Sequence, residues 1–153
     1  FDGYKYNTKY AIETIQTAYE SGASYIVLCD TNGGTLPFEL EKIIGHVKEK
    51  IPLNKIGVHF HNDSDVATAN SLEAIRLGVG QVQGTFNGLG ERCGNVNLIN
   101  VISNASIKLN YKMKLQKNLK IIGLNYKDKK KKIHEKYIKH TNSYYYRSGI
   151  PCN

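Results

Sequence analysis

Short strand-like segments alternate with longer amphipathic ones, and this alternation constrains the fold more than any other feature of the sequence. The strand-like segments span residues 25–29, 56–60 and 81–86. The first of them is a continuous apolar run, which is typical of a strand buried on both faces. The amphipathic segments span residues 8–21, 35–51, 65–77 and 96–109, with Thr35 as the expected cap of the second helix. Strands that alternate with helices over short connections predict an α/β fold with a parallel sheet.

The net positive charge of the chain comes entirely from its last third. Residues 1–105 contain 8 Lys+Arg and 11 Asp+Glu, whereas residues 106–153 contain 13 Lys+Arg and 2 Asp+Glu. This break separates residues 1–110 from a Lys/Tyr-rich tail at 111–153, which we expect to be low-complexity, solvated, and irregular or helical. A frame change in an A/T-rich linker would give the same composition. Nucleic-acid binding through Lys and Tyr ranks below both interpretations.

Composition and cysteine usage exclude two classes of protein. No apolar run approaches the roughly 20 residues that a membrane-spanning helix needs, which argues against a membrane protein. The three cysteines are odd in number and form no CxxC pair, which argues against a disulfide framework and predicts a cytoplasmic location. Because the chain begins with Phe1 and not with Met, we expect it to be processed or a fragment.

The most informative chemical pattern is the pair His59-x-His61 at the end of the second predicted strand. Side chains at positions i and i+2 of a strand point to the same side, so two imidazoles here could clamp a metal ion. An isolated pair of this kind is more often exposed or simply packed. Asn62 and Asp63 follow directly at a strand end, however, and this context favours the metal interpretation.

Two further polar clusters also follow strands, where barrels and doubly wound folds place their active sites. In the segment 30–34, Thr31 offers a hydroxyl to a carboxylate, although an ordinary turn is the better explanation of this segment taken alone. In the segment 88–95, Arg92 could bind phosphate or pair with Glu91, and the Asn95 carbonyl could reach a metal. A glycine-rich turn with a solvated ion pair explains the second segment equally well.

Together the three clusters resemble one enzyme family. The motifs His59-Phe60-His61-Asn62-Asp63 and Asn87-Gly88-Leu89-Gly90-Glu91-Arg92-x-Gly94-Asn95 are similar to those of the 2-isopropylmalate, homocitrate and citramalate synthases. These are metal-dependent Claisen-condensing enzymes with a (β/α)₈ TIM barrel. The resemblance runs to about residue 110 and implies a partial barrel, comprising about the last three strands and their helices. About half of the parent barrel would then be missing on the N-terminal side.

The resemblance also implies roles for individual residues. His59, His61 and Asn95 would bind a divalent metal, which could be Mn²⁺, Mg²⁺, Zn²⁺ or Co²⁺. Thr31 would be both a catalytic and a substrate-binding residue, and would bind the carboxylate or carbonyl end of a 2-oxo acid. The remaining candidates lie in the glycine-rich segment, where acetyl-CoA would meet the substrate: Gly88 and Gly90 as binding residues, Glu91 and Arg92 as catalytic residues.

Finer details favour the citramalate-forming members of the family. The segments 28–34, 63–65 and 91–95 are similar to that subgroup, with Asp65 and Cys93 where isopropylmalate synthases usually have Gly and Ala. This implies an acyltransferase of isoleucine biosynthesis that condenses acetyl-CoA with pyruvate, with 2-isopropylmalate synthase of leucine biosynthesis as the alternative. The parent enzyme would be a homodimer.

The same comparison implies that this chain alone is inactive. The aspartate ligand of the family lies on the first strand, in an Asp-Gly-x-x-Arg-Asp motif that is absent here. We also expect three strands alone to leave sheet edges and an apolar sheet face open, which would favour aggregation.

Overall fold

The computed structural model describes residues 1–111 and 144–147, with side chains for the first of these ranges. The helices are α1 (Asp2–Tyr6), α2 (Thr8–Glu20), α3 (Leu40–Lys48), α4 (Ala67–Arg76) and α5 (Leu98–Ile107). The strands are β1 (Ile26–Asp30), β2 (Ile56–Phe60), β3 (Gln81–Gly84) and β4 (Tyr144–Arg147). Short 3-10 turns are η1 (Pro37–Glu39), η2 (Leu53–Lys55) and η3 (Phe86–Gly88).

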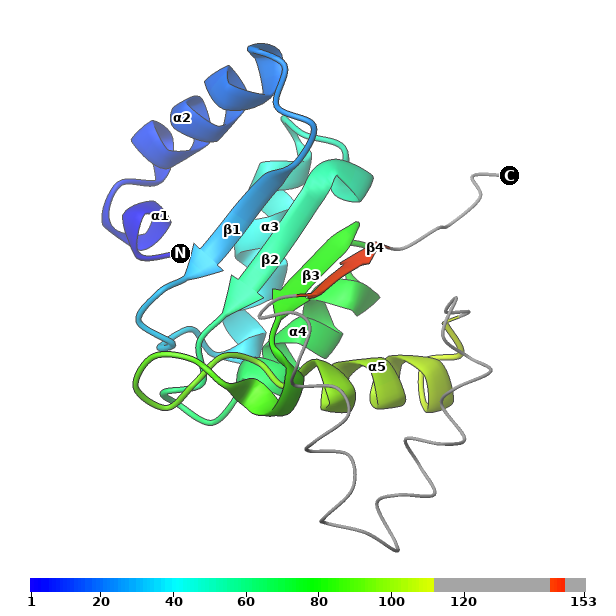
Figure 1. Cartoon of the computed structure of the whole chain (residues 1–153). Helices are drawn as coiled ribbons and strands as arrows, with labels where there is room; N and C mark the ends of the chain where they lie inside the picture. The colour runs from blue at the N-terminus through cyan, green and yellow to red at the C-terminus, as the bar shows by residue number, and fades with distance from the viewer. Residues whose placement is uncertain (112–143, 148–153) are drawn as a thin grey trace, which may run out of the picture.

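The strands β1, β2 and β3 form a parallel sheet in chain order, which confirms the predicted α/β architecture (Figure 1). In this register Cys29, His59 and Gln83 are aligned across the three strands. Because the strands are parallel, all their carboxyl ends meet at one edge of the sheet. The three polar segments that follow them are therefore brought together.

The strand β4 lies along the outer edge of β3 and runs antiparallel to it (Figure 1). This strand differs from the irregular or helical tail that we expected. Tyrosines have high strand propensity, and residues 144–147 are three tyrosines followed by Arg147. Residues 112–143 and 148–153 lie outside the described residues, so the expectation for the rest of the tail stays a prediction.

The two faces of the sheet differ in character because strand side chains alternate. Ile56, Val58 and Phe60 of β2 are fully buried and face α3 and α4, which lie behind the sheet in Figure 1. The opposite face carries Val27, Cys29, Gly57, His59, Gln81 and Gln83. The Gln81 amide lies over Gly57, where an added Cβ would stand 2.8 Å from Gln81 Oε1. Three of these six residues have polar side chains, namely His59, Gln81 and Gln83. The face is therefore mixed in character, and the expectation of an open apolar face stays a prediction.

The segment after β1 also differs from its prediction. Thr35 does not cap a helix: it is fully buried, and its amide donates to Asp30 Oδ2 at 3.0 Å. The chain turns through η1 before α3 begins at Leu40. The buried carboxylate of Asp30, at the end of β1, thus accepts a hydrogen bond from the backbone of Thr35. Within the described residues, no helix has the length and apolarity needed to cross a membrane.

Candidate metal centre

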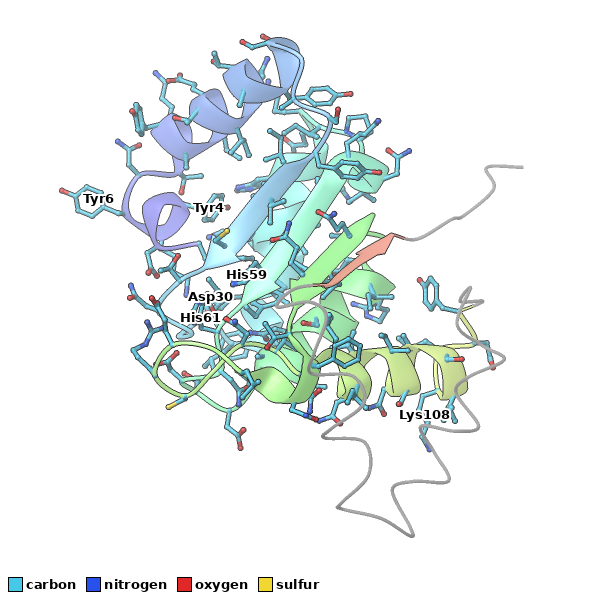
Figure 2. All side chains as sticks on the ribbon, in the orientation of Figure 1. Tyr4, Tyr6, Asp30, His59, His61 and Lys108 are labelled. Carbon is cyan, nitrogen blue, oxygen red and sulfur yellow. The ribbon has the colours of Figure 1, made fainter. Side chains whose placement is uncertain are left out.

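Three loops meet at the carboxyl edge of the sheet. They are the first loop (residues 30–35), the second loop (residues 61–66) and the third loop (residues 86–97). Backbone bonds connect them: His61 N donates to Asp30 O at 3.3 Å, and Asn62 N donates to Gly94 O at 2.9 Å. Figure 2 shows Asp30, His59 and His61 close together at this edge. The sequence prediction that the three clusters share one edge is therefore confirmed.

The imidazoles of His59 and His61 lie next to each other, with ring centroids 5.3 Å apart and planes inclined at 62°. Burial, and then the neighbouring His61, lower the pKa of His59 against a smaller opposing effect of the Asn95 side chain. The His59 ring is therefore neutral at pH 7, which is the state that binds metal ions. Nδ1 of His61 is buried and has no hydrogen-bond partner.

The third loop folds tightly around Asn95. Asn95 N donates to Gly88 O at 3.0 Å, and Asn95 Nδ2 donates to Leu89 O at 3.1 Å. Gly90 lies so close that an added Cβ would stand 2.5 Å from Asn95 Nδ2. Because its amino group is held by Leu89, the carbonyl Oδ1 of Asn95 is the free end of the amide. That oxygen is buried and forms no hydrogen bond of standard geometry, although the Asn95 side chain lies close enough to the His59 ring to oppose the lowering of its pKa.

Arg92 forms an ion pair with Asp63, a partner that the sequence did not predict. Its guanidinium forms two bonds to the carboxylate of Asp63, Nε to Oδ1 at 2.7 Å and Nη2 to Oδ2 at 3.0 Å. These bonds lower the pKa of Asp63. The expected partner Glu91 lies farther away, at 3.7 Å from Nη1. The sequence contained a signal for this pair, because Asp63 and Arg92 have opposite charges and follow neighbouring parallel strands.

The other candidate residues lie around the same edge. Thr31 is exposed and its carbonyl accepts a bond from Arg92 Nη2 at 2.6 Å. Gly88 has φ +70°, and an added Cβ would stand 3.0 Å from Asn95 O, so this glycine lets the loop close on itself. The Glu91 side chain is 80% exposed at the tip of the third loop.

The donor atoms at this edge fit a divalent metal. A buried polar atom without a hydrogen-bond partner is costly. Two such atoms, His61 Nδ1 and Asn95 Oδ1, belong to residues that pair with each other in an isolated β-bridge. Imidazole nitrogen and amide oxygen are ligands that bind Zn²⁺, Mn²⁺ and Co²⁺. Among the described residues there is no group of three or more His, Cys, Asp or Glu that could hold a metal.

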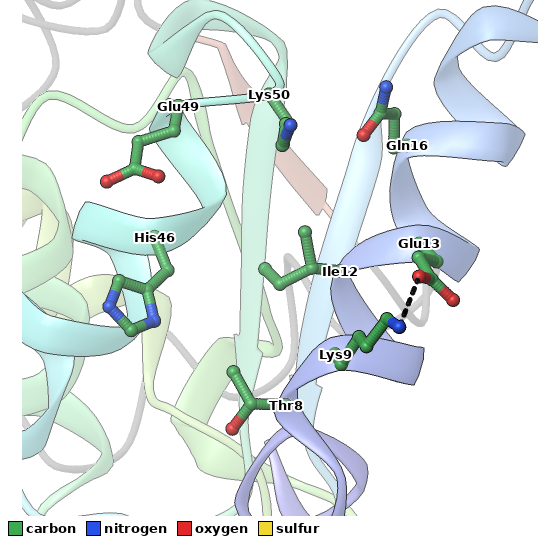
Figure 3. Close-up of a pocket in the computed structure, with 8 residues that line it drawn as sticks. All are labelled: Thr8, Lys9, Ile12, Glu13, Gln16, His46, Glu49 and Lys50. Carbon is green, nitrogen blue, oxygen red and sulfur yellow. Dashed lines mark ion pairs between the residues drawn. The ribbon is translucent and has the colours of Figure 1, made fainter.

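A separate pocket lies between α2 and α3, away from this edge (Figure 3). Its walls come from the surfaces of the two helices and include Thr8, His46 and Lys50. Next to it, the Tyr4 hydroxyl forms a hydrogen bond with His46 Nδ1 at 2.5 Å. The pocket contains none of the residues predicted for the site.

The fold and this edge define a class of protein: a parallel α/β domain with an imidazole–amide site at the carboxyl ends of its strands. The chain belongs to the HMGL-like family, whose model matches residues 2–124. The match extends past residue 110, where the motif resemblance ended. HMG-CoA lyase of Bacillus subtilis has a similar structure, with a TM-score of 0.64 and 26% identity over 76% of this chain and 42% of that one.

Two curated relatives show which branch of the family the chain resembles. It is 55% identical to (R)-citramalate synthase of Geobacter sulfurreducens over 109 residues, covering 71% of this chain and 20% of the relative. It is 40% identical to 2-isopropylmalate synthase of Streptococcus gallolyticus over 105 residues, covering 67% of this chain and 20% of the relative. The chain therefore spans about a fifth of the length of the curated relatives it matches.

Proposed function

We propose that this chain supplies the C-terminal part of the TIM barrel of an acyltransferase that condenses acetyl-CoA with pyruvate to form citramalate. Support comes from the family, from the higher identity to a citramalate synthase than to an isopropylmalate synthase, and from the site. The observation that carries the proposal is the pair of buried, unpartnered atoms His61 Nδ1 and Asn95 Oδ1 beside the neutral ring of His59.

In this proposal His59, His61 and Asn95 hold a divalent metal such as Mn²⁺, Mg²⁺, Zn²⁺ or Co²⁺. When bound, the metal supplies Lewis-acid polarisation of a 2-oxo acid. Thr31, exposed at the end of β1, orients the carboxylate or carbonyl end of that substrate. The third loop, with Gly88 and Gly90, borders the space where acetyl-CoA approaches. Glu91 is placed at the loop tip, where its carboxylate can meet a ligand entering from solvent.

The alternatives from the sequence have less support. Production of 2-isopropylmalate remains the nearest rival, since the residues that shape the oxo-acid pocket are expected in the first half of the barrel. The nucleic-acid interpretation depends on tail residues that lie mostly outside the described part of the chain, and it stays a prediction. The cytoplasmic location and the homodimer remain parts of the proposal.

The test is a segment exchange. Residues 1–109 would replace the matching segment of the Geobacter sulfurreducens citramalate synthase and, separately, of the Streptococcus gallolyticus isopropylmalate synthase. We expect citramalate formation in the first host at a kcat/KM within about tenfold of the unmodified enzyme, and a much larger loss in the second host. The matched control is the first hybrid with His61→Ala, which should be inactive but folded.

Two results would contradict the proposal. One is full activity of the His61→Ala hybrid, which would remove the ligand role. The other is better function in the isopropylmalate synthase host, which would move the chain to that branch. The 153-residue chain alone, with pyruvate, acetyl-CoA and Mn²⁺, should release no thiol.

A further inference from the structure

The contacts of Arg92 leave little of its guanidinium free for a ligand. Nε and Nη2 bind both oxygens of Asp63, and Nη2 also donates to the carbonyl of Thr31 at 2.6 Å. A planar fork bound to a carboxylate in this way is the strongest pairing available to an arginine. For Arg92 to bind a phosphate or a substrate carboxylate, it would first have to release Asp63.

These contacts connect the three loops of the candidate metal centre. Arg92 belongs to the third loop, Asp63 to the second and Thr31 to the first. A close approach strengthens the connection: an added Cβ at Gly33 would stand 2.6 Å from Asp63 Oδ2 and 2.8 Å from Asp63 N. The carboxylate of Asp63 is thus held between the backbone of the first loop and the guanidinium of the third.

The backbone at Arg92 indicates that this conformation has a cost. Its φ is +53°, in the left-handed region that side chains with a Cβ rarely adopt. Such a conformation persists only where surrounding contacts hold it. Two backbone bonds hold this turn, from Gly94 N to Glu91 O at 2.8 Å and from Asn62 N to Gly94 O at 2.9 Å. The contacts of the Arg92 side chain with Asp63 and Thr31 add to them.

The position of Asn95 depends on the same loop. Asn95 lies three residues after Arg92, and its amide reaches the imidazoles only while the third loop packs against the end of β2. We propose that Arg92 is a positioning residue, which ties the third loop to Asp63 and Thr31 and so holds the Asn95 carbonyl toward His59 and His61. The inference rests on the proposed function in one respect, that this edge binds a divalent metal.

The experiment measures metal binding on the 153-residue chain. Zn²⁺ alone is the probe, and the aromatic ¹H–¹³C NMR signals of His59 and His61 report the affinity of this site separately from other histidines. Arg92→Lys keeps the positive charge but loses the fork. The matched control is Arg76→Lys in α4, because Arg76 forms an equivalent two-bond pair with Glu73, at 2.9 and 2.6 Å, remote from the site.

We expect Arg92→Lys to weaken Zn²⁺ binding by about tenfold or more, as for other residues that orient metal ligands, with an unchanged circular dichroism spectrum. Arg76→Lys should leave the affinity within twofold. Asp63→Asn should weaken binding to a similar extent, and the double variant Arg92→Lys/Asp63→Asn should be no worse than either single one, because both changes break the same pair.

Each other outcome has a distinct meaning. If the unsubstituted chain shows no shift of either imidazole signal with Zn²⁺, the positioning role in this chain is overturned, whereas the proposed function is decided separately by the activity of the hybrid enzyme and its His61→Ala control. If the unsubstituted chain binds Zn²⁺ and Arg92→Lys binds it within twofold as tightly, only the positioning role is overturned. If Arg92→Lys fails to fold, the Zn²⁺ affinity of Asp63→Asn tests the positioning role in its place. Loss of the fold in both variants would make the pair an element of the fold and also overturn the positioning role.

Discussion

Gly90 offers a direct way to displace the Asn95 amide without changing any polar group. An added Cβ at residue 90 would stand 2.5 Å from Asn95 Nδ2 and 2.7 Å from Asn95 Cγ, where ordinary contacts begin near 3.4 Å. In Gly90→Ala the amide must therefore move by about 1 Å, at a cost of about 1–3 kcal/mol for an overpacked site. The move also breaks the bond from Asn95 Nδ2 to Leu89 O.

Two measurements check this prediction. Urea unfolding should show a lower free energy of unfolding for Gly90→Ala, and the imidazole signals of His59 and His61 should report weaker Zn²⁺ binding. Gly34→Ala is the matched control, because nothing lies within 4 Å of the added Cβ. Unchanged stability and unchanged Zn²⁺ affinity in Gly90→Ala would refute the idea that Asn95 is held in place by close packing of the third loop.

Two further predictions concern parts of the chain away from the site. The backbone amide of Leu36, followed by Lys5, lowers the pKa of Glu39. A lowered carboxyl pKa stabilises the fold above the unfolded pKa of about 4.3 and loses this effect as the pH falls through the folded pKa. Between pH 7 and pH 3 the unsubstituted chain should therefore lose about 1 kcal/mol more stability than Glu39→Gln; equal losses in urea titrations would contradict this. Gly45 lies within α3 with open space around it, so Gly45→Ala should raise the free energy of unfolding by about 0.5–1 kcal/mol; a lower midpoint of thermal unfolding would count against it.

The strands were predictable because their signal is local. The bounds expected for β2 are those observed, Ile56 to Phe60, since Pro52 ends the preceding predicted helix and a polar segment begins at His61. The parallel order followed from the alternation of strands and helices. By contrast, the start of α3 was placed too early, at Thr35. A threonine two residues before a proline indicates a cap, but here the backbone amide of Thr35 donates to the buried carboxylate of Asp30, five residues earlier. The sequence does not show that this carboxylate is buried at the end of β1 and needs a backbone donor.

The sequence was sufficient to predict which residues of the candidate site lie at the carboxyl edge of the sheet. His59 and His61 lie together because their spacing matches the strand period. The role of Asp63 was not apparent, because its partner Arg92 is 29 residues away and Glu91 is adjacent to Arg92 in sequence. Residues close in sequence were favoured as partners, whereas the left-handed conformation at Arg92 turns its guanidinium toward the second loop.

The polar side chains on the open face of the sheet have a consequence for solvation. The amides of Gln81 and Gln83 and the imidazole of His59 are groups that form hydrogen bonds with water. Gln83 Nε2 donates to Gln81 Oε1 at 3.3 Å, which leaves further donors and acceptors of both amides for solvent. A charged ligand entering this space exchanges ordered water for protein contacts, and such exchanges are close to neutral in free energy. Affinity on this face therefore depends on the few atoms at its carboxyl edge that water does not already satisfy.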